Sequence, residues 1–419
     1  MNKEICCIAE QCSKPKSGVH ELALLQLRPY IEGFLDATWI SSELKKYEAW
    51  AAKNSDPFLQ RSLLHSPPGF NMLAASIWAA RDWEKIYKDQ PSFSVPAGAK
   101  RLVNIACSLS VLELYAGQLL DQKARECLRK RLQHAEHVWG AIHELHTFTC
   151  FVRQGATVQP HFLKKASPQE IILQWQSVEI PVQCKSIKPG SGRLISQEVF
   201  TRLACYIARD AGAKKKRLLV RIGSTGNIRD EDVEFLRRAI SDNFGAGMRS
   251  ALVTNNRRTF MVHLQPLSGQ FTVKKIRDYL SSFNFHVGMI IGEPALDGTA
   301  YDVVAVVGID ADLKEKPWNT LLSSIQKGAD QLKGGPPGII AINYADPVSD
   351  FESLRQDDRP LKVVLGKLLT PRPHVGAVML TSEPDLQLPM KGAIGKPRIY
   401  HRLPWPFPKD FLSERILPK

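Results

Sequence analysis

The spacing of apolar side chains predicts a buried helix that begins near residue 138. Apolar or small residues recur along one helical face at alternating steps of four and three: Val138, Ile142, Leu145, Thr149 and Val152. A second stripe runs beside the first: Ala141, Phe148 and Phe151. Because these stripes cover most of the circumference, we expect little of the helix to face water, and Gly155 predicts its end.

One acid, Glu144, lies within the second apolar stripe of this helix. A carboxylate is costly to bury among apolar side chains unless a partner offsets its charge. We therefore expect a cation beside Glu144 in the folded chain.

Two β-rich segments follow the helix and flank Gln176 and Ser177. After a short strand in ATVQPHF, the segments EIILQW and VEIPVQCKSI are typical of the two arms of a hairpin. A two-residue loop pairs Trp175 with Val178, whereas a loop of another length shifts the register of the arms.

The predicted hairpin brings polar side chains together at its open end. Counting outward from a two-residue loop places Glu170 opposite Gln183, and Gln183 and Lys185 share one face of the second arm. A carboxylate, an amide and an ammonium therefore converge at one end of a small sheet. We expect Glu144 to approach them from the helix.

The pattern along the whole chain divides it into five regions. We expect an N-terminal helical domain at 1–133, the first part of an α/β core at 134–213, an α+β insertion at 214–312, the second part of the core at 313–383, and a proline-rich extended tail at 384–419. The helical domain is a candidate surface for a protein partner.

The core strands allow two orders. Either 214–312 is inserted between the third and fourth strands, or the core closes earlier, through helix 196–211 and strand 217–222. In the first order the fourth strand is GIIAINY, whose apolar sequence is typical of a sheet centre. The helix before that strand has a predicted buried stripe: Leu321, Leu322, Ile325, Ala329 and Leu332. A helix in DDRPLKVVLGKLL and a strand in HVGAVMLTS extend the sheet.

The insertion alternates strands with two helices, which predicts a compact sheet with both helices on one face. The helices lie in DEDVEFLRRAISDNF and TVKKIRDYLSSF, with Asp230 and Thr272 as expected N-caps. The insertion is either a packing element or a nucleic-acid reader that uses its basic side chains: Arg249, Arg257, Arg258, Lys274 and Lys275.

Charge adds a candidate partner to this picture. The 419 residues include 56 Lys and Arg against 42 Asp and Glu, a formal net charge of +14. This excess favours a polyanion such as DNA or RNA, and the alternative is a basic protein with evenly spread charge. A basic helix edge precedes the buried helix and is either a phosphate-contacting face or a solvated surface: Arg125, Arg129, Lys130 and Arg131.

The eight cysteines are scattered without CxxC pairs. Cys6, Cys7, Cys12 and His20 fit no standard zinc knuckle, and several of the other cysteines are better explained as buried thiols of a reducing cytoplasm. No apolar run approaches the length that spans a bilayer. We expect a soluble, cytoplasmic protein that does not bind membranes.

The predicted cluster of oxygens suits Mg²⁺ or Mn²⁺, which keep several waters and take only one or two protein carboxylates. A nearby lysine can orient an attacking water and offset charge in a phosphoryl-transfer transition state. Glu144, Glu170, Gln183 and Lys185 together therefore indicate a phosphodiesterase site.

This order of parts resembles the PD-(D/E)XK nuclease superfamily, which has the restriction-endonuclease-like fold. The superfamily pattern is a helix with a Glu, a strand, a Pro-Asp that begins the next strand, and Asp/Glu-x-Lys in the third. Four positions match it in turn: Glu144 the helix acid, Glu170 the Asp, Gln183 the second acid and Lys185 the lysine. The resemblance implies an α/β core of that fold with a mixed sheet.

The chain departs from the superfamily pattern at two places. Pro-Gln-Glu replaces the Pro-Asp, and Gln183-Cys184-Lys185 replaces the Glu-x-Lys. A Gln is tolerated there in some members because its side-chain oxygen still coordinates, although one negative charge is lost. The resemblance implies metal ligation by Glu144, Glu170 and Gln183. Residues near the site are expected to contact nucleic acid: Lys188, Arg193, Arg202 and Gln331.

Three functions follow as hypotheses. The first is a metal-dependent nuclease that acts on DNA rather than RNA, in host defence or mobile-element biology as the superfamily suggests. The second is a catalytically silent nuclease-like scaffold that binds nucleic acid or protein. The third is an RNA-binding assembly factor that reads through the α+β unit. A structural alternative makes Gln183 and Lys185 ordinary polar positions of an edge strand, with Glu170 paired to Lys164 or Lys165.

Overall fold

The computed structural model describes residues 19–53, 70–89, 97–117, 120–163, 169–187, 195, 197–224, 226–256, 258–267, 271–272, 285–294, 300–310, 319–344, 359–382, 398–402 and 404–411. The chain divides into two compact units. The first comprises Met1–Trp50, Leu64–Pro189 and Trp318–Lys419, and the second comprises Ala51–Leu63 and Gly190–Pro317. The described part is a mixed α/β structure with ten α-helices and two mixed sheets.

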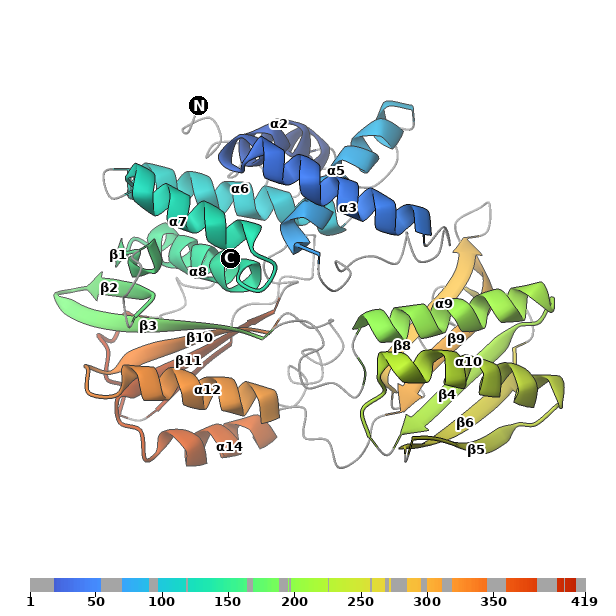
Figure 1. The fold of residues 1–419 in the computed structure, drawn as a ribbon. Helices are drawn as coiled ribbons and strands as arrows, with labels where there is room; N and C mark the ends of the chain where they lie inside the picture. The colour runs from blue at the N-terminus through green and yellow to red at the C-terminus, as the bar shows by residue number, and fades with distance from the viewer. Residues whose placement is uncertain are drawn as a thin grey trace. The chain divides into compact units, whose positions relative to one another are not determined.

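The first unit begins with a layer of helices that share one apolar core with the sheet (Figure 1). The helices are α2 (Val19–Phe34), α3 (Ala37–Lys53), α5 (Met72–Asp89), α6 (Ala97–Tyr115), α7 (Gln122–Gln133) and α8 (Val138–Arg153). The predicted buried helix is confirmed as α8, which contacts all three of the strands that follow it. Among the helices that the structure describes, none has both the length and the apolar sequence needed to cross a bilayer.

The sheet of the first unit has six strands in the order β1-β2-β3-β10-β11-β12. They are β1 (Thr157–Gln159), β2 (Ile171–Trp175), β3 (Val178–Ile187), β10 (Gly338–Tyr344), β11 (Val375–Ser382) and β12 (Arg398–His401), and a 3-10 turn (η1, His161–Leu163) follows β1. The first three strands are antiparallel, β3, β10 and β11 are parallel, and β12 is antiparallel to β11.

The two faces of this sheet pack against different helices because successive side chains point to opposite sides. Along β10, Ile339 and Ala341 join the core beneath α8, whereas Ile340 and Ile342 join a second core. That second core is covered by α12 (Asn319–Leu332) and α14 (Arg359–Leu369) (Figure 1). Four of the five positions predicted for the buried stripe of α12 are fully buried, and Leu322 is partly buried.

The hairpin register is confirmed. Trp175 pairs with Val178, and the register continues to Ile171 against Val182. Gln176 and Ser177 both have positive φ, 46° and 68°, as a two-residue turn requires if its twist is to match that of the strands.

The order of the core strands follows the first of the two alternatives. β10 pairs directly with β3, so residues 190–317 are inserted between two neighbouring parallel strands. The central position of β10 agrees with its apolar sequence.

The second unit has a sheet in the order β5-β6-β4-β9-β7, with β8 also paired to β9. Its strands are β4 (Leu218–Ser224), β5 (Ser250–Asn255), β6 (Arg258–Pro266), β7 (Phe271–Thr272), β8 (Phe285–Pro294) and β9 (Ala300–Asp310), and its described helices are α9 (Gln197–Ala213) and α10 (Asp230–Gly245). Helix α9 shares the core of this unit, so the insertion begins near residue 190 rather than at 214. Phe200, Leu203 and Ile207 give α9 the apolar face that packs there.

The N-cap prediction for α10 is wrong by one residue. Arg229 is the N-cap, and the Asp232 carboxylate accepts a hydrogen bond from the Arg229 N–H at 2.9 Å. Asp232 is fully buried and also binds Arg258, which is therefore engaged within the unit. Thr272 lies in β7, and the helix predicted after it lies outside the described residues, as do Arg257, Lys274 and Lys275.

The tail is not only an extended surface segment. Its described part includes the edge strand β12, and Phe407 and Phe411 are buried in the core of the first unit. The close approach of Phe407 requires a glycine in β11, because a Cβ on Gly376 would lie 2.4 Å from the Phe407 ring. Long-range packing therefore builds part of the tail into the fold.

Replacing Gly338 by alanine should destabilise the first unit by about 1–3 kcal/mol, because overpacking forces the backbone to shift. A Cβ there would lie 2.6 Å from the Pro181 carbonyl oxygen on β3. Chemical denaturation measures the loss. Gly366→Ala is the matched control, since nothing lies within 4 Å of its added Cβ in α14, and helix propensity favours alanine there by up to about 1 kcal/mol. Equal stability of the two variants would contradict the prediction.

Candidate functional site

The predicted partner of Glu144 is an arginine of the preceding helix. The Arg131 guanidinium donates to both carboxylate oxygens, at 2.6 and 2.7 Å, and to the Phe162 carbonyl at 3.1 Å. Glu144 is only 6% exposed. Burial raises the pKa of its carboxyl, and the Arg131 hydrogen bonds and charge oppose that shift.

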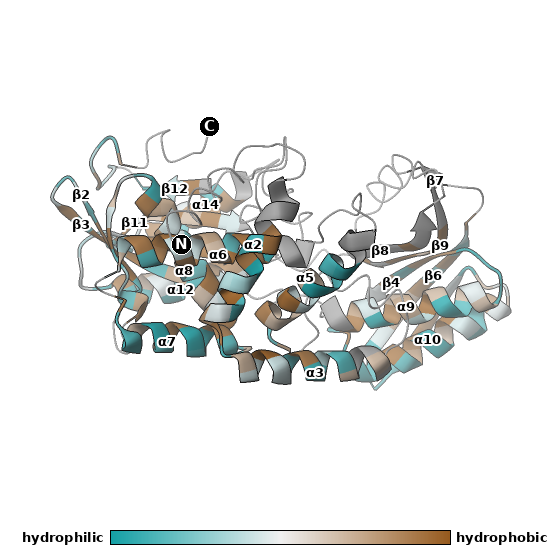
Figure 2. Ribbon diagram, turned by 90° about the horizontal axis from the view of Figure 1, so that it is seen from above, coloured by the Kyte–Doolittle hydropathy of each residue, from teal (hydrophilic) through white to brown (hydrophobic). Residues whose placement is uncertain are grey.

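Arg131 reaches this position from α7, which Figure 2 shows as largely hydrophilic. Only one stripe of α7 is buried: Ala124, Leu128 and Leu132. The N-terminus of this helix is held by Asp121, whose carboxylate accepts a hydrogen bond from the Ala124 N–H at 2.6 Å. The apolar stripe seats α7 against the core, and Arg131 at its edge can therefore enter the core beside α8.

The other three predicted residues meet at the end of the hairpin. The Lys185 ammonium lies 3.2 Å from Gln183 Oε1, 3.2 Å from the Cys184 carbonyl oxygen and 3.5 Å from Glu170 Oε1. The second oxygen of Glu170 accepts from the Cys184 N–H at 3.2 Å, which ties the acid to β3. We call Glu170, Gln183, Cys184 and Lys185 the hairpin cluster.

Glu144 is linked to the hairpin cluster through its charge. The negative charge of Glu170 contributes to raising the pKa of Glu144, and the positive charge of Lys185 opposes it. The hydrogen bonds described for Glu144 go to Arg131. The structure therefore brings the four predicted residues into one electrostatic neighbourhood, with direct contacts among three of them.

The edge-strand alternative for Gln183 and Lys185 is wrong. Strand β3 lies between β2 and β10, and Gln183 is fully buried. Glu170 pairs with Lys185, while Lys164 and Lys165 lie outside the described residues.

The predicted nucleic-acid contacts have different fates. Lys188 and Arg193 lie outside the described residues. Arg202 belongs to α9 in the second unit, where it forms an ion pair with Asp230. Gln331 is exposed on α12. None of these four residues has a described contact with the hairpin cluster.

The basic edge of α7 is engaged within the chain. Arg125 pairs with Glu113, and both Arg129 and Lys130 pair with Glu126. Exposed pairs of this kind contribute little stability and leave the side chains able to move. These residues form a solvated charged surface that is still accessible to a polyanion.

His143, directly before Glu144, is a buried residue for which the sequence analysis predicts no role. Its Nε2 lies 3.0 Å from the Ala341 carbonyl oxygen of β10. Burial lowers the pKa of His143 to about 4, although the hydrogen bond to the backbone opposes the shift. A polar residue directly before Glu144 in an apolar helix was the available signal, since a buried polar ring requires a partner.

The donors of the hairpin cluster fit a hard divalent cation. Three oxygens converge on one cationic atom, the Lys185 Nζ, and they are a carboxylate oxygen, an amide oxygen and a backbone carbonyl oxygen. Magnesium prefers such oxygens and needs few carboxylates. Within the described residues, no group of three or more His, Cys, Asp or Glu side chains is placed to hold a metal. A metal here would therefore depend on Gln183 and the Cys184 carbonyl.

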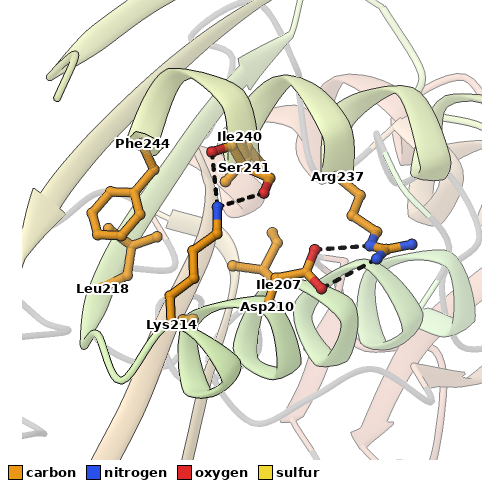
Figure 3. A pocket seen from close by; sticks show the side chains of 9 residues that line it. Ile207, Asp210, Lys214, Leu218, Arg237, Ile240, Ser241 and Phe244 are labelled. Atoms are coloured by element: carbon orange, nitrogen blue, oxygen red, sulfur yellow. Dashed lines mark hydrogen bonds and ion pairs between the residues drawn. The ribbon is translucent and has the colours of Figure 1, made fainter. Parts of the chain in front are cut away.

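A hollow in the second unit is too small for a ligand. It lies between α9 and α10, where Arg237 binds Asp210 at 2.8 and 3.2 Å and Lys214 binds the Ser241 carbonyl and hydroxyl oxygens (Figure 3). Its volume is about 10 Å³, which is the space of a single water at most. These polar contacts clamp the two helices together.

Replacing Arg131 by methionine should lower the free energy of unfolding by about 2–4 kcal/mol, because it leaves the Glu144 carboxylate buried without its bidentate partner. Lys130→Met is the matched control on the same helix, since Lys130 is 73% exposed and its loss should cost less than about 0.5 kcal/mol. Adding Glu144→Met to Arg131→Met should recover part of the loss in denaturation experiments. Additive destabilisation in the double variant would refute the pairing.

Acid should destabilise the first unit through its buried histidines. Burial lowers the pKa of His146 to about 3, and its Nδ1 lies 2.9 Å from Ser108 Oγ on α6. Because the folded pKa lies below the unfolded value, this contribution is intact above about pH 6.5 and is lost as the pH falls. At pH 5 the stability lost through His146 amounts to roughly 2 kcal/mol. Urea denaturation at pH 7 and pH 5 measures the free energy of unfolding at each pH. Between these two pH values, His146→Gln should lose roughly 2 kcal/mol less of that free energy than the parent. Equal losses in the two proteins would contradict the prediction.

No family model matches this chain, and neither a curated protein nor a solved structure matches it. The role of the hairpin cluster is therefore inferred from its geometry and chemistry.

Proposed function

We propose that this chain is a divalent-metal-dependent nuclease that hydrolyses phosphodiester bonds, with DNA as its substrate. The observation that carries the proposal is the hairpin cluster, in which three oxygens converge on the Lys185 ammonium. Glu144, with its own guanidinium partner, stands in the same electrostatic neighbourhood.

The order and direction of the elements support a restriction-endonuclease-like core. A buried helix with a Glu is followed by three antiparallel strands, and a later helix and strand complete the sheet through β10, parallel to β3. This is the order of parts that the resemblance to the PD-(D/E)XK superfamily implies. The resemblance also suggests a role in host defence or mobile-element biology.

Each residue of the site has a distinct task in this proposal. Glu170, Gln183 and the Cys184 carbonyl would hold Mg²⁺ or Mn²⁺, and Glu144 would contribute the second negative charge. The bound ion polarises a phosphate and lowers the pKa of a coordinated water. Lys185 would be displaced from the three oxygens but stays anchored on β3, where its ammonium can orient the water and offset charge in the transition state.

The net charge of +14 supports a polyanionic substrate. Arg125 and Lys130 on α7 pair with Glu113 and Glu126, and the two basic side chains are 51% and 73% exposed. Such pairings exchange readily for phosphate contacts. The α7 surface therefore offers a nucleic-acid backbone a basic path toward Arg131 and Glu144.

A second function is favoured by a specific observation. Each carboxylate of the site already has a cation of the chain beside it, Arg131 for Glu144 and Lys185 for Glu170. A site whose charge is already balanced can persist as a catalytically silent scaffold that binds nucleic acid or a protein.

Lys185→Ala should abolish metal-dependent cleavage of supercoiled plasmid, with a rate loss of at least about 100-fold because it removes the charge beside the reacting water. The measurement is the conversion of supercoiled to nicked and linear DNA in Mg²⁺ or Mn²⁺, with an EDTA blank. Lys327→Ala, on the exposed side of α12, is the matched control and should keep the parental rate.

The outcomes separate the two functions. Cleavage that Lys185→Ala leaves unchanged, or that proceeds in EDTA, would rule out the proposed site. If the purified parent does not cleave, and its DNA binding is salt-sensitive and indifferent to metal and to Lys185→Ala, the silent scaffold is the better account. Cleavage of RNA but not DNA would overturn the choice of substrate.

A further inference from the structure

The Arg131–Glu144 pair is unusual because a basic residue of the chain occupies both oxygens of a proposed metal-site acid. The guanidinium binds Glu144 at 2.6 and 2.7 Å and is steadied by the Phe162 carbonyl at 3.1 Å. A bidentate pair of this kind is stronger than a single hydrogen bond and takes up the lone pairs that face it. Glu144 is therefore not available to a metal while Arg131 remains in place.

We propose that Arg131 is an internal counter-cation that a substrate phosphate draws away from Glu144, so that divalent metal and nucleic acid bind cooperatively. This inference rests on the proposed function and adds to it a positioning residue and a coupling between two ligands. Arg131 acts through Glu144 in the free protein and through the phosphate in the complex.

The charges of the site give the reason for the coupling. Two carboxylates, Glu144 and Glu170, are balanced by Arg131 and Lys185 within hydrogen-bond or ion-pair distance. A divalent ion added alone would leave a net charge of about +2 in a cluster where Glu144 is 8% and Lys185 19% exposed in their side chains, which is unfavourable where water screens poorly. Phosphodiester groups of a nucleic acid offset that charge, so each ligand lowers the cost of binding the other.

The position of Arg131 allows the exchange of partners. Its side chain is 27% exposed, against 8% for the Glu144 side chain, so the guanidinium has a path toward solvent. A guanidinium matches phosphate as well as carboxylate with the same two-pronged geometry. When Arg131 turns from Glu144 to a phosphate, the metal site loses one cation. Arg131 is then paired with the phosphate, and Glu144 is paired with the metal ion.

Linkage requires the coupling to be reciprocal: if nucleic acid raises the affinity for metal, metal raises the affinity for nucleic acid by the same factor. The probe is Mn²⁺ alone, titrated into the full chain and followed by the electron paramagnetic resonance signal of free Mn²⁺. The titration is repeated with a saturating DNA duplex in which a methylene group replaces each bridging 3′ oxygen, so that the negative charge is kept and the P–O3′ bond is absent. Duplex titrated with Mn²⁺ in the absence of protein gives the background.

The parent should bind Mn²⁺ at least about tenfold more tightly with the duplex than without it, a coupling of ordinary size. Arg131→Gln should bind Mn²⁺ about tenfold more tightly than the parent without DNA, and the duplex should then add less than about threefold. Arg81→Gln is the matched control, since Arg81 makes a similar two-pronged pair with Glu32, at 2.9 and 3.0 Å, outside the proposed site, and it should behave as the parent does.

Circular dichroism will show whether Arg131→Gln folds, and a second variant tests the role of Arg131 if it does not. Arg131→Lys keeps the positive charge and loses the two-pronged contact, so its affinity for Mn²⁺ without DNA should lie between those of the parent and the expected Arg131→Gln value. The titrations of the parent with and without duplex need no variant.

Equal Mn²⁺ affinity of the parent with and without duplex would overturn the coupling. Parental affinity in a folded Arg131 variant would overturn the role of Arg131. In either case metal-dependent plasmid cleavage by the parent would leave the nuclease proposal standing. Failure of every protein to bind Mn²⁺ in either condition, together with no cleavage, would overturn both.

Discussion

The pairing of β2 with β3 across a two-residue turn sets the positions of the residues in the hairpin cluster. The register brings Ile171 opposite Val182, so Glu170, the next residue, reaches the Cys184 N–H and the Lys185 ammonium. A slip of one residue would exchange the two faces of β3 and turn Gln183 and Lys185 toward α8. Because α8 covers one face of β3 with an apolar core and α12 covers the other, such a slip would bury the polar side chains of Gln183 and Lys185 in that apolar core, which is costly. The chemistry of the cluster is thus a consequence of sheet packing.

The burial of Glu144 follows from the same packing and creates a different problem. A largely apolar helix covers the hairpin, and its one acid must be neutralised where water is scarce. The chain supplies Arg131 from the preceding helix. A buried ion pair of this kind is weak evidence for stability, because an apolar pair of similar size often serves as well. In the proposed mechanism Glu144 exchanges Arg131 for a metal ion, a role that an apolar pair could not fill.

The local pattern of apolar and polar residues was sufficient to predict helices, turns and strand register, which depend mainly on residues close together in the sequence. The helical spacing from Val138 to Val152 gave α8, and the β-rich arms around Gln176 and Ser177 gave the turn and the register. The apolar sequence of β10 gave its central place in the sheet. Glu170, Gln183 and Lys185 could be chosen because a strand alternates faces and a hairpin register can be counted from its turn. Glu144 could be chosen because it is the one acid within the apolar stripes of α8.

The features that sequence reasoning missed depend on contacts between distant segments. The amphipathic sequence of α9 does not say which sheet it covers, and in the structure it packs in the second unit. The proline-rich tail gave no signal that Phe407 fills space above Gly376 or that residues 398–401 complete a sheet edge. Arg131 is one of five cations on α7, and only the packing of that helix distinguishes the one that enters the core.

The most direct test of the central claim is a crystal structure of the protein soaked in Mn²⁺ together with a non-cleavable oligonucleotide, with the metal located by anomalous scattering. The account predicts a single strong peak at about 2.1–2.2 Å from oxygens of Glu170, Gln183 and Cys184, with the Lys185 ammonium displaced from them. An ammonium still seated on those three oxygens, with no manganese among them, would contradict it.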